Sequence, residues 1–180
     1  MTYFVRLLLL LTPLVFSCTS QVTTLSHSSI FQSGKQSLIA IAPMEDCTLN
    51  RGSSRAAALL TESLKKRVEQ KGHLALTSAK SSQKQFLVTL QLLQYGTNFS
   101  EPSELNISIL LKIWDMRADK PQEIYQEMIT YTTLLNGPLP KEDELDCSST
   151  AFRVGPLGLA HAKMARELST RIEDYIRMAM

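Results

Sequence analysis

The sequence predicts an α+β fold, a two-layer sandwich in which two helices pack on one face of a mixed sheet of four to five strands. Two observations support this fold class. Several short segments alternate apolar and polar residues or are apolar throughout, as strands are, and two longer segments repeat apolar residues at helical spacing. Their order is strand, helix, strand, strand, strand, strand, helix, and residues 38–180 are numerous enough for one domain with its own core.

Folded structure is expected to begin at residues 37–43, an apolar run typical of a strand that is buried on both faces. A turn follows, in which Ser53 or Ser54 is the expected N-cap of a helix. Residues 57–70 place apolar residues on one stripe and charged residues elsewhere, which predicts that helix. Residues 74–77 are predicted to form a short strand, joined to the first by a crossover through the helix.

Three longer strands are expected next. Residues 86–95 alternate apolar and polar side chains, and residues 105–114 do so more regularly. Residues 123–134 favour a strand but are more polar, which indicates an edge position. Pro156 suits the first turn of a closing helix. The apolar stripe of that helix has a spacing of four and consists of Ala160, Met164, Leu168, Ile172 and Ile176.

Residues 1–17 are typical of a secretory signal, because Arg6 precedes an apolar run shorter than the roughly 20 residues that a membrane span needs. The run ends in Val15-Phe16-Ser17-Cys18, which resembles a bacterial lipobox and predicts that Cys18 is the lipidated first residue of the mature chain. An ordinary secretory signal with an incidental cysteine is the alternative. Residues 18–37 are rich in Ser, Thr and Gln, which predicts a lipidated flexible tether.

The residue after the lipobox cysteine predicts where the protein is located. Thr19 is not the aspartate that, in lipobox-bearing enteric proteins, favours retention in the inner membrane. By that resemblance we expect the chain in the bacterial outer membrane, anchored by its lipid, with its domain on the periplasmic face.

The sequence contains no motif of a known catalytic or cofactor site. It has no Gly-x-Ser-x-Gly elbow, phosphate loop, dinucleotide-binding turn or His-Glu-x-x-His zinc pair. Its histidines, His27, His73 and His161, are isolated from one another and are expected at the surface. The formal net charge of +2 gives no indication of nucleic-acid binding. We therefore expect no enzymatic activity, no cofactor and no bound metal.

Two cysteines remain after Cys18, namely Cys47 and Cys147. In an oxidising periplasm they are expected to form a disulfide. It would close a loop of about 100 residues and stabilise the fold by roughly 4–5 kcal/mol in the chain-entropy model. The alternative is two unpaired thiols, with Cys47 buried beside the end of the first strand.

A basic cluster lies near the end of the first predicted helix and consists of Lys65, Lys66, Arg67 and Lys71. One interpretation is favourable pairing with the helix C-terminal dipole, together with a Glu62–Lys66 contact. The other is a patch that binds a phosphorylated glycolipid or the anionic surface of a partner.

Four aromatic residues on the predicted strands have two interpretations. They are Trp114, Tyr95, Tyr125 and Tyr131. They either anchor an interface on an exposed sheet face or pack in the core.

Several short motifs together resemble the lipopolysaccharide-assembly lipoprotein family (LptE-like). The family's first strand motif is matched by residues 39–48, Ile-Ala-Ile-Ala-Pro-Met-Glu-Asp-Cys-Thr, and its Leu-Thr-x-x-Leu helix motif by residues 60–64. Residues 113–115, Ile-Trp-Asp, match a strand end, and residues 124–125, Ile-Tyr, match a strand beginning. The resemblance covers residues 38–180.

This resemblance implies a non-catalytic subunit of envelope assembly that binds an outer-membrane β-barrel protein and takes part in lipopolysaccharide transport. Lipopolysaccharide itself is then a candidate ligand. The same strand-helix opening also occurs in lipoproteins that activate peptidoglycan synthases and in the curli-secretion lipoprotein, so a periplasmic adaptor or regulator of a cell-wall synthase or secretion channel is the alternative. A flexible tether of 20 residues has an r.m.s. span of about 25 Å, which favours a partner in or near the same membrane.

Overall fold

The computed structural model describes residues 36–49, 52–97, 103–135, 137–141, 145 and 149–180. Lys35–Met180 form one compact unit. The predicted signal peptide, the lipidation site and nearly all of the predicted tether lie outside the described residues.

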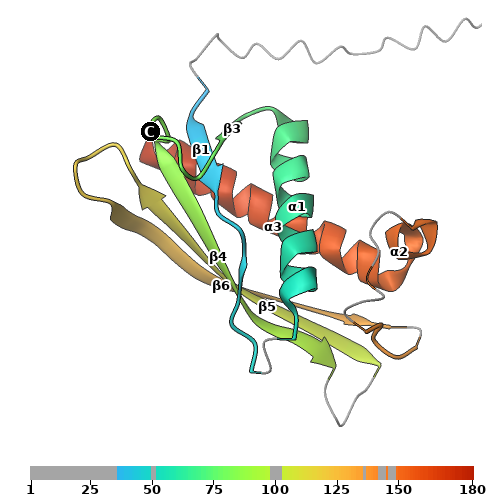
Figure 1. Ribbon diagram of the computed structural model, residues 1–180. Coiled ribbons are helices and arrows are strands. Elements are labelled where there is room, and N and C mark those ends of the chain that lie inside the picture. Colours follow the sequence, from blue (N-terminus) through green and yellow to red (C-terminus); the bar gives the residue numbers. More distant parts are fainter. Residues whose placement is uncertain (1–35, 50–51, 98–102, 136, 142–144, 146–148) are drawn as a thin grey trace, which may run out of the picture. The chain divides into compact units, whose positions relative to one another are not determined.

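Within the described residues, one sheet of six strands carries the fold, with helices packed against it (Figure 1). The elements in chain order are β1 (Leu38–Ile41), β2 (Glu45–Asp46), α1 (Ser54–Lys71), β3 (Ala75–Thr77), β4 (Phe86–Thr97), β5 (Glu104–Asp115), β6 (Gln122–Leu134), α2 (Thr150–Val154) and α3 (Pro156–Ala179). The strand order is β3-β1-β4-β5-β6, and β2 also pairs with β4. β1 is parallel to both of its neighbours, whereas β4, β5 and β6 form an antiparallel meander. The predicted fold class is confirmed, and β6 lies at the edge of the sheet as expected.

β1 and β2 follow one another along the same side of β4. Between them the amide of Ala42 still donates a hydrogen bond to the carbonyl of Val88 at 2.9 Å. Pro43 has no amide hydrogen to donate, so the ladder is interrupted there and resumes in β2. The sequence pattern predicted the end of the first strand near Pro43 but missed β2, because two residues are too few to show a period.

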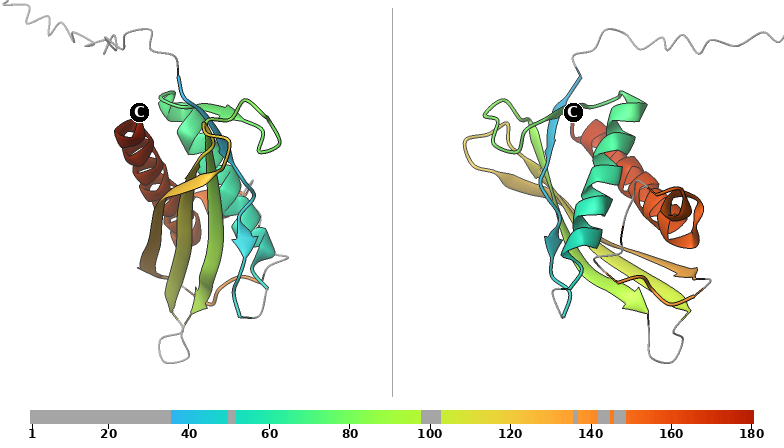
Figure 2. Two further views of the ribbon diagram at one scale, coloured as in Figure 1. Left: turned by 90° about the vertical axis from the view of Figure 1, so that its left-hand side faces the viewer. Right: turned by 45° about the vertical axis from the view of Figure 1, so that its right-hand side comes forward.

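α1 and α3 lie on the same side of the sheet and contact each other (Figure 2). The alternating strand residues that were expected to share a face are buried beneath them: Phe86, Val88, Leu90, Leu92, Leu105, Ile107, Ile109, Leu111 and Ile113. The stripe predicted on the closing helix is buried against the same interior. Burying one such side chain stabilises the fold by about 1.5–3 kcal/mol, so this shared interior holds the helices on the sheet.

Side-chain hydrogen bonds of Thr61, which are buried, and of Asp46, which is part-buried, hold α1 against the first strand segment. The Thr61 hydroxyl accepts a hydrogen bond from the Met44 amide at 3.0 Å, and it donates one to the Ala57 carbonyl at 2.9 Å. The Asp46 carboxylate accepts from the Ser53 amide at 2.8 Å. Ser53 is the N-cap residue, but its side chain makes no capping hydrogen bond. The motif residues Asp46 and Thr61 therefore have a structural role, because they lock α1 onto the β1–β2 segment.

α2 was not predicted, and it packs closely on the first turn of α3. Pro156 opens α3, as the sequence indicated. A Cβ atom added at Gly158 would lie 2.0 Å from the Phe152 carbonyl oxygen, far inside contact distance. Glycine is therefore required at this position by the backbone of α2.

Candidate functional site

One face of the sheet carries no helix within the described part of the chain (Figure 2). We call it the open sheet face. Trp114 lies on it opposite Leu87, and its indole N–H donates to the Thr89 hydroxyl at 3.2 Å. Leu110 lies opposite Met128, which is 62% exposed. A half-exposed surface that mixes an aromatic residue, methionine and polar groups is typical of a protein interface.

The three strand tyrosines lie on the other, helix-covered side of the sheet. Tyr125 stacks on Tyr175 of α3 with ring centroids 3.4 Å apart. Tyr95 and Tyr131 pack against the hydrophobic core. Core packing is thus the correct interpretation for these tyrosines, and of the four predicted aromatics only Trp114 belongs to the open sheet face.

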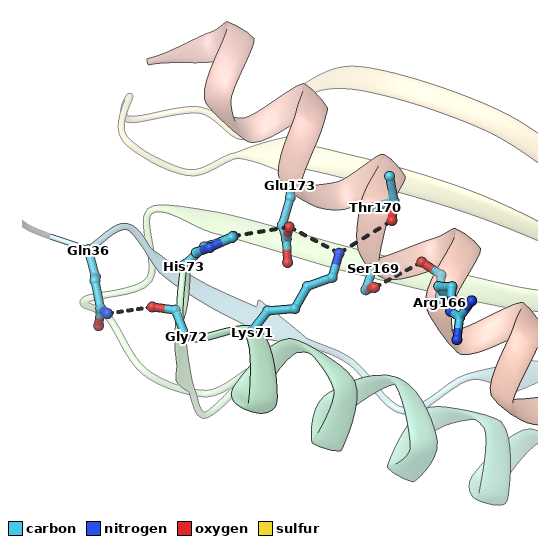
Figure 3. A network of polar contacts seen from close by, with 8 residues as sticks. All are labelled: Gln36, Lys71, Gly72, His73, Arg166, Ser169, Thr170 and Glu173. Carbon is cyan, nitrogen blue, oxygen red and sulfur yellow. Dashed lines mark hydrogen bonds and ion pairs between the residues drawn. The ribbon is translucent and has the colours of Figure 1, made fainter. Parts of the chain in front are cut away.

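Lys71, one of the four predicted basic-cluster residues, is held in a polar network between α1 and α3 (Figure 3). Its Nζ atom lies 3.1 Å from Oε2 of Glu173 and 3.3 Å from the Thr170 hydroxyl. Nδ1 of His73 lies 3.4 Å from the same carboxylate oxygen. Glu173 is only 7% exposed, so its charge needs these partners. Lys71 is therefore committed to an internal ion pair that ties the two helices together.

Two other members of the cluster, Lys66 and Arg67, line a groove between α1, α2 and α3. The groove has a volume of about 380 Å³. We call it the basic groove. Its charged lining consists of Glu62, Lys66, Arg67, Arg153 and Arg166, and Lys65 is not part of it. Within the described residues none of the four cations forms an ion pair, and the expected Glu62–Lys66 contact is absent. The Nε atom of Arg67 is buried and has no hydrogen-bond partner among the residues described.

His161 also lines the basic groove, and it is 1% exposed rather than at the surface as predicted. Its Nε2 atom lies 3.0 Å from the Tyr95 hydroxyl, and its ring meets those of Tyr95 and Phe152 edge-on. Burial lowers the pKa of His161 to about 4, so the imidazole is neutral at neutral pH. Burial also raises the pKa of Tyr95, whose hydroxyl stays protonated. Nδ1 of His161 is buried without a partner among the described residues.

The predicted disulfide and lipidation residues fall largely outside the described part of the chain. Cys47 is exposed after β2, so the alternative in which it is buried is wrong. No disulfide occurs among the described residues, and Cys147 lies outside them, as does Cys18. The Cys47–Cys147 pairing and the lipidation of Cys18 stay predictions. The described residues also contain no cluster of His, Cys, Asp and Glu side chains that could hold a metal ion.

Solved structures with a similar fold are distant in sequence. Protein CT253 of Chlamydia trachomatis is 20% identical, with a TM-score of 0.64 over 79% of this chain and 98% of that one. Protein XCC0632 of Xanthomonas campestris, of family DUF330, is 11% identical, with a TM-score of 0.59 over 81% and 87%. Lipoprotein GNA1162 of Neisseria meningitidis is 10% identical over 57% of this chain and 85% of that one, with a TM-score of only 0.41. The first two matches support the fold and not the specific resemblance to the lipopolysaccharide-assembly family.

Residues 91–180 match the family model of DUF7499, a family of unknown function. The matched half comprises most of β4 together with β5, β6, α2 and α3. No curated protein matches the chain in sequence.

Of the helices in the described ranges, none combines the length and apolar character that a membrane span requires.

Proposed function

The chain belongs to the DUF7499 family, and we propose that it is a lipid-anchored envelope protein that acts as a non-catalytic subunit of envelope assembly. In its most specific form the proposal is lipopolysaccharide transport beside an outer-membrane β-barrel protein. One observation carries it: a lipobox-like sequence and a tether lead to a folded unit whose sheet leaves one face open.

Anchoring is supported by the order of segments at the start of the chain. The apolar run that ends at Cys18 is too short to span a bilayer. Two or more acyl chains on such a cysteine hold a protein stably on a membrane. A flexible tether of the length predicted for residues 18–37 has an r.m.s. span of about 25 Å, which favours a partner in or near the same membrane.

Partner binding is supported by the open sheet face and by the edge strand. Trp114 and Met128 present the large side chains that interfaces favour. β6 is 13 residues long, and no described strand pairs with its outer edge. Such an edge offers backbone donors and acceptors to a strand of another protein. The described domain thus presents an extended surface suited to another protein.

A non-catalytic role is supported by the way in which the domain uses its described histidines. His73 lies beside the carboxylate of Glu173, and His161 is buried against Tyr95. Both contacts join segments far apart in the chain. We assign these histidines to the architecture rather than to proton transfer.

Site-specific photo-crosslinking in intact cells tests the proposal. A photoreactive residue replaces Met128 on the open sheet face, and a matched variant carries it at Met178, which is 71% exposed on α3. We expect a single large adduct with an outer-membrane β-barrel protein from position 128 only, and its loss when Cys18→Ala removes the anchor. An adduct with a cell-wall synthase or a secretion channel would instead support the adaptor alternative. Equal labelling from both positions, or none from position 128, would contradict docking on the open sheet face.

A further inference from the structure

We propose that the basic groove is a binding site for a phosphate monoester, the group shared by phosphorylated lipid headgroups and soluble sugar phosphates. The inference goes beyond the proposed function, because it needs neither a barrel partner nor the open sheet face. It rests on the charge of the groove, on two unpartnered polar groups and on the size of the cavity.

The groove concentrates positive charge that the described residues do not neutralise. Lys66 and Arg67 come from α1, Arg153 from α2 and Arg166 from α3, against the single carboxylate of Glu62. Like charges in one concavity raise the local potential and attract an anion. Lys71, one turn after Arg67 on α1, instead pairs with the buried Glu173 of α3. Lys71 is thus paired within the domain, whereas the groove cations form no ion pair among the described residues. This difference indicates that the groove cations are available to bind an anion from outside the domain.

Arg67 presents the group that phosphate recognition favours. Its planar guanidinium can donate two parallel hydrogen bonds to two oxygens of one phosphate. Its Nε atom is buried but lacks a partner among the described residues. A buried donor without an acceptor is unfavourable, and a phosphate oxygen in the groove would satisfy it.

His161, which lines the same groove, is a neutral side chain with a ring nitrogen that is unpartnered among the described residues. The protonated Tyr95 hydroxyl lies 3.0 Å from Nε2, and a phenol is the stronger hydrogen-bond donor of the two groups. Tyr95 therefore donates to Nε2, which leaves the ring hydrogen on Nδ1. That atom is buried without a partner in the described chain, on a side chain that lines the groove and is itself 1% exposed. A phosphate oxygen that reaches Nδ1 from the groove would be the acceptor that this donor lacks.

The size of the groove limits the ligand. A volume of about 380 Å³ lies in the lower part of the range of roughly 300–1,000 Å³ found for small-molecule sites. It accommodates a phosphate with a body the size of one sugar. Acyl chains would have to remain outside, so a lipid would be bound by its headgroup alone.

Titration calorimetry on the full-length chain in detergent tests the site. The probes are inorganic phosphate, glucose 1-phosphate, and mixed micelles that contain either phosphatidic acid, a phosphate monoester, or phosphatidylglycerol, a diester. We expect Arg67→Gln and Arg166→Gln each to weaken binding about tenfold or more, because each removes charge-assisted hydrogen bonds. Lys65→Gln and Arg177→Gln, matched changes on the same helices outside the groove, should leave the dissociation constant within about twofold.

The outcomes separate the two sources of phosphate. Tighter binding of phosphatidic acid than of glucose 1-phosphate assigns the site to a lipid headgroup, and the reverse order assigns it to a soluble phosphate. The proposal is overturned if no monoester binds, if phosphatidylglycerol binds as well as phosphatidic acid, or if the groove variants bind as the wild type does. Thermal unfolding of each variant checks the fold. Arg166 is exposed, so we expect Arg166→Gln to fold. It therefore still tests phosphate binding if Arg67→Gln does not fold.

Discussion

Acidification should destabilise the domain through His161. In the folded chain burial lowers the pKa of this imidazole to about 4, whereas in the unfolded chain it has the ordinary value of about 6.5. Between these values the unfolded chain binds a proton that the folded chain excludes, so a falling pH favours unfolding. The effect is absent above about pH 6.5, grows as the pH falls, and is complete below about pH 4.

The magnitude follows from the difference between the two pKa values. A difference of about 2.5 units corresponds to about 3 kcal/mol in the free energy of unfolding. Between about pH 7.5 and about pH 5 the expected loss is about 2 kcal/mol. Small domains are stable by only about 5–15 kcal/mol, so this loss is readily measurable.

Urea unfolding followed by far-UV circular dichroism, at several pH values, measures the effect in the wild type and in His161→Phe. Phenylalanine keeps an aromatic ring against Tyr95 and Phe152 but does not titrate. The variant loses the hydrogen bond to Tyr95, so the comparison uses the pH dependence and not the absolute stability. The difference between wild type and variant should change by about 2 kcal/mol over the range. A difference that stays constant with pH would show that the titration of His161 is not linked to folding.

Three further substitutions test the contacts that build the domain, each by urea unfolding. Thr61→Val should destabilise it by about 1–3 kcal/mol, because the buried Met44 amide loses its acceptor. Gly158→Ala should destabilise it by about 1–3 kcal/mol, because the new Cβ meets the Phe152 carbonyl. Asp46→Ala should cost about 1 kcal/mol, because the amide at the start of α1 loses its carboxylate acceptor.

Each substitution has its own control. Thr61→Ser keeps the hydroxyl and should recover most of the loss, and failure to do so would remove the hydrogen bond from the explanation. Asp46→Asn keeps one side-chain acceptor and should lie between wild type and alanine. For Gly158→Ala the test is the sign of the change in the free energy of unfolding. In an unstrained helix, replacing glycine with alanine stabilises the helix by about 1 kcal/mol. If Gly158→Ala stabilises the domain, the Phe152 carbonyl of α2 does not lie close enough to Gly158 of α3 to exclude a Cβ atom.

The sheet was predictable because its signals are local. Alternation in residues 105–114 identified β5, and the polar character of residues 123–134 indicated that β6 lies at the edge of the sheet. The spacing of four after Pro156 likewise identified α3. β2 and α2 were missed because segments of two and five residues contain less than two periods of any pattern.

The basic groove could be predicted only in part, because its parts come from separate elements. The predicted cluster on the first helix includes Lys66 and Arg67, which line the groove, but Arg153 and Arg166 are brought beside them by packing alone. The sequence gives no sign that Lys71 meets a carboxylate 102 residues further along the chain. His161 is buried by a contact with Tyr95 that spans 66 residues, which no local pattern contains.

Mass spectrometry of the mature N-terminus, from protein isolated with the outer-membrane fraction, tests the lipid anchor most directly. We expect a chain that begins at Cys18 and carries acyl groups, and a Cys18→Ala chain that is neither acylated nor retained in that fraction. A mature chain that begins at another residue, or an unmodified Cys18 on a chain that still sediments with the membrane, would contradict this expectation.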